Sequence, residues 1–228
     1  MYELYIANKN YSSWSMRPWV LMRGLGLPFK EHLKPFTEKY VAGEFRSFSP
    51  SGRVPCLVDG SLTVWDSLAI VEYLAERHPG VWPAAADARA WARCAAAEMH
   101  SGFATLRNQC SMSVGVRVRL HAMDDALKGD LARIEELWAV GLARHGGPFL
   151  GGARFSAVDA FYAPVATRVQ TYNLPVGEVS KGYVSRLLAL PAVVEWIEAG
   201  IAETWRDPPH DRDVLAAGTV LQDLRRKA

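Results

Sequence analysis

The sequence has few of the features that define membrane, secreted and zinc-binding proteins. Its 228 residues include only Cys56, Cys94 and Cys110 as cysteines, without a CxxC pair, so reduced thiols are expected and not a disulfide framework or zinc site. No uninterrupted apolar run reaches the ~20 residues that a membrane-spanning helix requires. Glu3 and Lys9 do not fit the apolar region of a secretory signal. We therefore expect a protein that remains in the cytoplasm and has no membrane partner.

The chain also shows little excess of charge of either sign. Its 26 basic and 24 acidic side chains nearly cancel, and no Lys/Arg-rich stretch is long enough for a nucleic-acid footprint. The six histidines are scattered without the spacing of metal ligands, so no metal is expected. Apolar residues make up 50% of the chain and can bury a sizeable core. These proportions indicate an ordinary globular protein without a nucleic-acid partner.

Residues 1–80 change their hydrophobic period repeatedly, which predicts alternating strands and helices. Residues 3–7 predict a short strand, and a helix is expected over about residues 15–24. Pro18 fits only the first turn of that helix, where its missing amide hydrogen costs no bond. Residues 29–34 predict a second extended segment, which completes a β-α-β unit.

A hairpin and a helix follow this unit. The extended segments 54–58 and 62–65 flank Asp59-Gly60-Ser61, in which Asp-Gly favours a tight turn. A helix is predicted over residues 67–78, and Pro79-Gly80 ends it. The apolar face of this helix comprises Leu68, Val71, Leu74 and Ala75. The order β-α-β, hairpin and helix is that of a thioredoxin-like domain.

The remainder of the chain is predicted to be helical. A linker rich in Pro, Gly and Ala at residues 79–86 separates a thioredoxin-like domain, residues 1–80, from an all-helical domain, residues 87–228. One long helix is expected over residues 87–109, because Gly102 is the only glycine or proline within it. The predicted fold class is therefore a thioredoxin-like α+β domain followed by an all-α domain.

Three further helices in this half have signals of their own. Apolar residues recur at spacings of three and four over residues 127–142, and Gly146-Gly147 closes that helix. Ser156 and Asp159 stand three apart like a capping box, so a helix is predicted to begin at Ser156. A last helix is expected near residues 191–205. The polar, Pro-rich tail that follows has no assignment.

Three short motifs at these separations resemble a cytosolic glutathione S-transferase. They are Ser12-Ser13-Trp14-Ser15, Ser51-Gly52-Arg53-Val54-Pro55 and Asp66-Ser67-Leu68-Ala69-Ile70. With the thioredoxin-like order and the helical remainder, the resemblance covers nearly the whole chain. The zeta class is the most similar, because its catalytic segment has two serines, a cysteine and a third serine followed two positions later by arginine. Ser12, Ser13, Ser15 and Arg17 fit that pattern, whereas Trp14 replaces the cysteine.

The serine segment suggests how such a protein activates the thiol of glutathione. Ser12 and Ser15 have SxxS spacing where a redox thioredoxin-like protein uses CxxC, and hydroxyls donate hydrogen bonds but form no disulfide. A thiolate at a helix N-terminus also gains from the helix dipole. The resemblance makes Ser12 the catalytic residue, with Ser13 and Ser15 as alternatives, although each could serve only as a helix cap. Other classes use a tyrosine near the end of the first strand, so Tyr5 and Tyr11 remain open as alternatives.

The resemblance also implies which residues bind glutathione. Pro55 is expected to follow a cis peptide, so that the backbone of Val54 pairs with the cysteinyl backbone of glutathione. The Ser67 hydroxyl and nearby amides are expected to take the γ-glutamyl carboxylate, and Asp66 the ammonium group. The alternatives are an edge-strand proline and a helix cap that bind no ligand. The predicted glutathione-binding residues are Ser13, Trp14, Val54, Pro55, Asp66 and Ser67.

The second substrate is expected between the two domains, against the helix near Met99, Phe103, Arg107 and Asn108. The predicted electrophile pocket includes Tyr11, Phe103, Arg107 and Asn108. Asn108 matches an asparagine of the zeta class, whereas Ala104 stands where a glutamine is expected. Thr171 stands where the isomerases of that class carry an arginine for an acidic substrate. Both Trp14 and Thr171 therefore argue against maleylacetoacetate isomerisation.

The resemblance implies an enzyme that conjugates glutathione to a small hydrophobic electrophile, as in detoxification. Glutathione is the only cofactor or co-substrate expected, and the identity of the electrophile is not predicted. Two alternatives stay open. One is a zeta-like isomerase or dehalogenase with glutathione as a true cofactor, and the other is a non-catalytic transferase-like module that binds a protein partner. Because family members are usually homodimers, the resemblance also implies a two-fold dimer.

Overall fold

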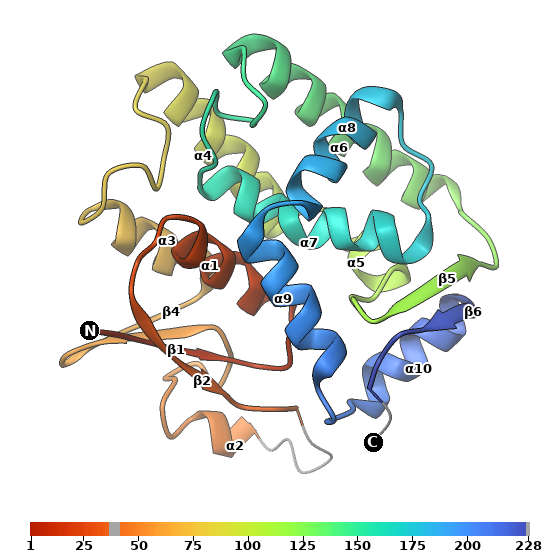
Figure 1. Cartoon of the computed structure of the whole chain (residues 1–228), viewed down its shortest axis with the longest axis horizontal. Helices are drawn as coiled ribbons and strands as arrows, with labels where there is room; N and C mark the ends of the chain where they lie inside the picture. The colour runs from red at the N-terminus through yellow and green to blue at the C-terminus, as the bar shows by residue number, and fades with distance from the viewer. Residues whose placement is uncertain (37–41, 227–228) are drawn as a thin grey trace.

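The computed structural model describes residues 1–36 and 42–226 of the chain. The amino-terminal part contains a mixed four-stranded sheet with helices, and the carboxy-terminal part is mostly helical (Figure 1). This arrangement confirms the predicted fold class. Within the described ranges, no helix combines the length and the apolar character needed to cross a membrane.

The sheet is formed by β1 Tyr2–Ile6, β2 Phe29–Leu33, β3 Cys56–Asp59 and β4 Leu62–Trp65, in the order β2-β1-β3-β4. β1 and β2 are parallel because a helix carries the chain back between them, whereas β3 is antiparallel to both β1 and β4. Gly60 has φ 60° in the tight turn between β3 and β4, a conformation that glycine reaches without strain. The predicted strands and hairpin are therefore confirmed.

Three helices belong to this part: α1 Ser13–Gly24, α2 Ala42–Phe45 and α3 Ser67–Ala75. Because α1 begins at Ser13, Pro18 is its sixth residue, and the expectation that Pro18 lies in the first turn is wrong. The helix tolerates it there because only one backbone hydrogen bond, to the carbonyl of Trp14, is lost. α1 packs against α3 on one side and against the carboxy-terminal helices on the other (Figure 1).

The carboxy-terminal part contains seven helices and two strands among the described residues. The helices are α4 Ala86–Ser101, α5 Ala104–Gln109, α6 Asp125–His145, α7 Ala157–Tyr172, α8 Glu178–Leu188, α9 Pro191–Ala202 and α10 Pro208–Ala217. The strands are β5 Val116–Leu120 and β6 Gly218–Asp223, which pair antiparallel. α7 is almost completely buried and packs against α1, α4 and α8. It therefore forms the centre of this part and its main contact with the sheet domain.

Two features of this half differ from the sequence-based expectation. The single helix expected over residues 87–109 is wrong, because the chain breaks between α4 and α5. Phe103 takes the left-handed conformation at φ 55°, and a Cβ on Gly102 would lie 2.8 Å from the carbonyl oxygen of Glu98. The second difference is that α8, α10 and the β5–β6 pair have no counterpart in the prediction. The fold class stands, with this small sheet added to the helical domain.

The start of α7 is held by the predicted capping box. The backbone N–H and the hydroxyl of Ser156 both donate to Asp159 Oδ2, at 3.0 and 3.3 Å. Asp159 Oδ1 accepts from the backbone N–H of Leu150 at 3.0 Å and from the Tyr183 hydroxyl at 2.8 Å. One fully buried carboxylate thus joins the loop before α7 to α8. The helix C-terminus predicted at Gly146 is also confirmed, with this glycine at φ 62°.

Candidate active site

Ser12 lies at the N-terminus of α1 as its N-cap. Its hydroxyl oxygen accepts from the backbone N–H of Ser15 at 3.3 Å, and the hydroxyl donates to Ser15 Oγ at 2.8 Å. The side chain is 5% exposed, so it is shielded from bulk water without being sealed off. A hydroxyl in this place combines a hydrogen bond with the positive end of the α1 dipole, which suits an anion.

The two other serines of the segment have different surroundings. Ser15 is completely buried, and its Oγ also accepts from the backbone N–H of Ala7 at 3.2 Å, which joins α1 to the end of β1. Ser13 is the first residue of α1 and is nearly buried, and its hydroxyl forms no hydrogen bond with the described residues. Ser12 and Ser13 therefore keep some access to a ligand, whereas Ser15 is fully buried and its hydrogen bonds stabilise the segment.

The loop that leads from β1 to Ser12 is fixed by the carboxy-terminal domain. Glu203 is the C-cap residue of α9, and its buried carboxylate accepts from the backbone N–H of Lys9 at 2.7 Å and of Asn10 at 3.3 Å. The side chain of Asn10 donates to Ser113 Oγ at 3.2 Å and accepts from the backbone N–H of Gly115 at 2.9 Å. Residues from two distant parts of the chain thus set the path of the backbone before the serines.

Trp14 stands between cationic side chains from two domains. The guanidinium of Arg17 lies 4.2 Å from its ring centre, and that of Arg107 lies 5.4 Å away. The His100 ring meets the indole edge-on, with centroids 5.2 Å apart. Arg107 lies in α5, after the break between α4 and α5, and packs near the Trp14 ring. Trp14 therefore connects the serine segment to α4 and α5.

Arg17 is the most unusual charged group of the site. Its side chain is 1% exposed, and Nε and Nη1 are buried with no hydrogen-bond partner among the described residues. The pKa of Arg17 is lowered to about 9, mainly by burial and to a smaller extent by the like charges of Arg168 and Arg107. The structure thus holds a cation behind the serine segment without a counter-ion from the described residues.

Asp66 and Ser67 lie at the N-terminus of α3, as predicted. Asp66 Oδ1 accepts from the backbone N–H of Leu68 at 2.8 Å, and Oδ2 lies 3.4 Å from His100 Nε2. Asp66 has φ 76°, a strained backbone conformation for a residue other than glycine. The Ser67 hydroxyl is buried and has no hydrogen-bond partner among the described residues. The Asp66 carboxylate, the Ser67 hydroxyl and the amides of α3 therefore occur together. This suits a ligand that carries one positive and one negative group.

The peptide bond between Val54 and Pro55 is cis, as the sequence led us to expect. Val54 is half-buried and Pro55 buried, immediately before β3. The described residues thus include all six that we predict to bind glutathione. They come from the N-terminus of α1, the entry to β3 and the N-terminus of α3.

The four residues predicted for the electrophile pocket lie just before α1 and at α5, and their role in that pocket stays a prediction. Arg107 faces Trp14, and Phe103 is buried at the start of α5. The Tyr11 hydroxyl donates to Asp211 Oδ1 of α10 at 3.0 Å. Because that proton is taken, Tyr11 serves here as an anchor for α10.

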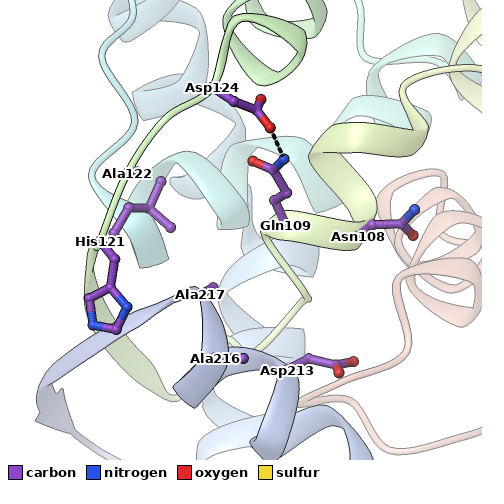
Figure 2. A pocket seen from close by; sticks show the side chains of 9 residues that line it. Asn108, Gln109, His121, Ala122, Asp124, Asp213, Ala216 and Ala217 are labelled. Carbon is purple, nitrogen blue, oxygen red and sulfur yellow. Dashed lines mark hydrogen bonds between the residues drawn. The ribbon is translucent and has the colours of Figure 1, made fainter.

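Asn108 lines a pocket of about 410 Å³ (Figure 2). The pocket lies between α5, the segment after β5 and α10, and Gln109 and Asp124, which share a hydrogen bond, both line it. Asp213 from α10 completes one wall. Prediction from sequence missed this wall because α10 belongs to the tail that had no assignment.

The fold and these residues define a thioredoxin-like domain that presents two helix N-termini to a helical domain. The first of two family models that match, the N-terminal domain of glutathione S-transferases, covers residues 11–77. The second, the C-terminal domain of glutathione S-transferases, covers residues 83–199. The chain therefore belongs to the glutathione S-transferase family of enzymes.

Several curated proteins are similar in sequence. Glutathione S-transferase 1 of Dianthus caryophyllus is 28% identical over 169 residues, which are 71% of this chain and 74% of that protein. A probable maleylacetoacetate isomerase of Caenorhabditis elegans is 25% identical over 75% of this chain and 80% of its own. A dichloromethane dehalogenase of Methylorubrum extorquens is 41% identical over 61 residues, 26% of this chain and 21% of that protein.

Solved structures share the fold. A glutathione transferase homolog from Burkholderia with bound glutathione superposes with a TM-score of 0.66 at 24% identity, over 87% of this chain and 97% of that one. A theta-class glutathione S-transferase from Xanthomonas axonopodis pv. citri, also with glutathione bound, superposes with a TM-score of 0.65 at 23% identity, over 86% of this chain and 96% of that one.

Proposed function

We propose that this protein conjugates glutathione to a small hydrophobic electrophile and that the Ser12 hydroxyl stabilises the glutathione thiolate. The observation that carries the proposal is the place of Ser12, almost buried at the N-terminus of α1, where a hydrogen bond and the helix dipole act on the same point. On binding, the hydroxyl turns from Ser15 Oγ to the sulfur. The sulfur then attacks a carbon of the electrophile, a C–S bond forms, and the leaving group departs with its electron pair.

The energy required is modest. Lowering a thiol pKa by one unit takes about 1.4 kcal/mol of preferential stabilisation of the thiolate. A hydrogen bond to a charged group contributes roughly 1.5–3 kcal/mol, and the helix terminus adds about 0.3–1 kcal/mol. These terms lower the pKa of a thiol from its free value of ~8.5 to near neutrality.

Glutathione would lie across the two helix N-termini. We propose that the Asp66 carboxylate takes the γ-glutamyl ammonium, and that Ser67 and the α3 amides take the carboxylate. The unpartnered, buried Ser67 hydroxyl supports this, because an orphan donor is costly unless a ligand satisfies it. The Val54 backbone would pair with the cysteinyl backbone, while Ser13 and Trp14 contact the ligand from α1. The domain at residues 1–80 would thus bind glutathione, and that at residues 87–228 would complete the electrophile pocket.

A Ser12→Ala variant tests the catalytic assignment. With 1-chloro-2,4-dinitrobenzene as the electrophile, kcat/KM at neutral pH is expected to fall by about 10- to 100-fold, because one to two units of thiol pKa are lost. Ser13→Ala is measured beside it as the alternative. Tyr11→Phe tests the tyrosine alternative and is expected to retain the rate, because the Tyr11 hydroxyl donates to Asp211. An unchanged rate in Ser12→Ala would sink the serine assignment.

A second candidate is a zeta-like isomerase or dehalogenase that regenerates glutathione. The similarity to a probable maleylacetoacetate isomerase and to a dichloromethane dehalogenase favours it. Thr171 argues against an acidic substrate at that place, since it is buried, uncharged and donates to the carbonyl of Ser113 at 2.9 Å. Turnover of maleylacetoacetate or dichloroacetate without net loss of glutathione would establish this function instead.

We also propose a homodimer, as is usual in this family. Analytical ultracentrifugation is expected to give a single species of twice the mass of the chain. A monomer at micromolar concentration would contradict this proposal and leave the assignment of Ser12 untouched.

A further inference from the structure

Arg17 is a buried cation that forms no salt bridge within the part of the chain that the structure describes. Nε and Nη1 are sealed from solvent without a hydrogen bond, and no ion pair of the described residues includes this guanidinium. The other charged and titratable groups that act on it are Arg107 from α5, Arg168 and Tyr162 from α7, and Asp66 at the start of α3. The charges of Arg17, Arg107 and Asp66 also act on His100 of α4. Three guanidinium groups thus face one carboxylate.

The guanidinium lies behind the first turn of α1. Arg17 follows Ser13 by four residues and Trp14 by three, so all three share one face of the helix. Long side chains of a helix lean toward its N-terminus, and the guanidinium indeed stacks 4.2 Å from the centre of the Trp14 ring. On its other side the Phe161 ring lies 4.9 Å away. The charge is therefore held by two aromatic rings close to the turn that carries Ser12 and Ser13.

Such an arrangement destabilises the ligand-free fold. A buried charge without a partner loses its hydration, and replacing it by an apolar side chain of similar size is often neutral or stabilising. Arg107 and Arg168 add repulsion between like charges. An anion that approaches this charge when a ligand binds would offset the cost.

We propose that Arg17 is the counter-charge of the glutathione thiolate, acting from behind Trp14 without touching the sulfur. This inference rests on the proposed function, which places the sulfur at the N-terminus of α1. When the thiol ionises, its proton passes to solvent, and the negative sulfur remains between the Ser12 hydroxyl and the field of Arg17. Because the guanidinium is buried away from water, the attraction is weakly screened and acts over several ångströms. Arg17 is thus a positioning charge, and Ser12 remains the residue in contact.

The carboxylates of glutathione are less suitable partners for this charge. In the proposed pose the γ-glutamyl carboxylate lies at α3, where Ser67 and the helix amides receive it. The remaining alternative is a carboxylate on the ligand that reaches Arg17 directly. A ligand with the same carboxylates but no ionisable thiol separates the two sources.

An Arg17→Met variant provides the test, with two results expected together. The ligand-free variant is expected to unfold at the same or a higher urea concentration than the wild type, because an unpaired buried charge is removed. The pKa of the bound glutathione thiol, followed by the ultraviolet absorbance of the thiolate, is expected to rise by about one unit, a tenfold loss of thiolate below that pKa. Arg17→Lys keeps the charge and is expected to recover part of the shift.

Affinity measurements identify the anion. The wild type is expected to bind glutathione more tightly than S-methylglutathione above the thiol pKa, and Arg17→Met is expected to remove this difference. Arg23→Met is the matched control, because Arg23 lies on the same helix, stacks 5.3 Å from the Trp19 ring and is half exposed. Arg23→Met is expected to leave the affinity for both ligands unchanged.

Three outcomes would overturn the inference. An unchanged thiol pKa in Arg17→Met shows that the charge does not act on the sulfur. Equal losses of affinity for glutathione and S-methylglutathione assign Arg17 to a carboxylate. Failure of the wild type to bind either ligand would contradict the proposed function itself. An Arg17→Met variant that binds glutathione normally with an unchanged thiol pKa would contradict only the role of Arg17.

Discussion

An Asp159→Ala variant is expected to lose roughly 3–5 kcal/mol of unfolding free energy, because a buried group with several partners is removed. Asp159 is fully buried and accepts four hydrogen bonds. Without it, the backbone N–H groups of Leu150 and Ser156 and the Tyr183 hydroxyl remain in the interior without an acceptor. Urea unfolding followed by tryptophan fluorescence measures the loss.

Asp124→Ala is the matched control for this variant. Asp124 is the N-cap of α6 and accepts from the backbone N–H of Leu127 at 2.8 Å, so it too is a helix-capping aspartate, but it lies at the surface. Its removal is expected to cost about 1 kcal/mol, as is usual for a helix cap. Equal losses in the two variants would show that burial of Asp159 adds nothing beyond capping.

The cost of Asp159→Ala is also expected to depend on pH. Burial raises the pKa of Asp159 to about 6, above its ordinary 3.8, so the folded state takes up the proton more readily than the unfolded state. The stability contributed by this carboxyl is therefore present at low pH and is lost as pH rises from about 4 to 6. We expect the variant to cost about 1 kcal/mol more at pH about 5 than at pH about 7. The opposite sign would contradict the raised pKa.

The second large effect is expected at Glu203. Glu203→Ala leaves the backbone N–H groups of Lys9 and Asn10 without their acceptors, at an expected cost of about 2–4 kcal/mol. The same change frees the loop that precedes Ser12. We therefore expect the kcat of conjugation to fall by a larger factor than the KM rises. Both are measured with enzyme that is fully folded at the assay temperature.

Glu203→Gln separates positioning from simple destabilisation. Glutamine keeps one carbonyl oxygen for the closer donor, the backbone N–H of Lys9 at 2.7 Å, and is expected to recover most of the stability and part of kcat. A Glu203→Ala variant that is destabilised but has a normal kcat when folded would show that the loop holds Ser12 without this carboxylate.

Local signals were sufficient for much of the fold. The Asp-Gly turn after β3, the capping box of Ser156 and Asp159 and the glycine at Gly146 depend on a few neighbouring residues, so the sequence alone predicts them. The site motifs at Ser12 and Asp66 belong to this class too, because each is a helix N-terminus whose cap is its own first residue.

The features that were missed depend on distant partners. The break at Gly102 follows from a close contact with the Glu98 carbonyl that a run of alanines does not reveal. α10 has few apolar residues and is fixed by Tyr11 and Arg225 through Asp211, from opposite ends of the chain. The burial of Arg17 likewise needs Phe161 from α7. Its spacing of four from Ser13 was the one signal that could have indicated it.

The pKa of the glutathione thiol in the complex tests the central claim most directly. Titrating the thiolate absorbance of glutathione bound to the wild type is expected to give a pKa one to two units below the ~8.5 of a free thiol. Ser12→Ala is expected to return it most of the way to that value, while Tyr11→Phe leaves it unchanged. A bound thiol that titrates at the free value in the wild type, or a pKa that Ser12→Ala does not move, would contradict the account.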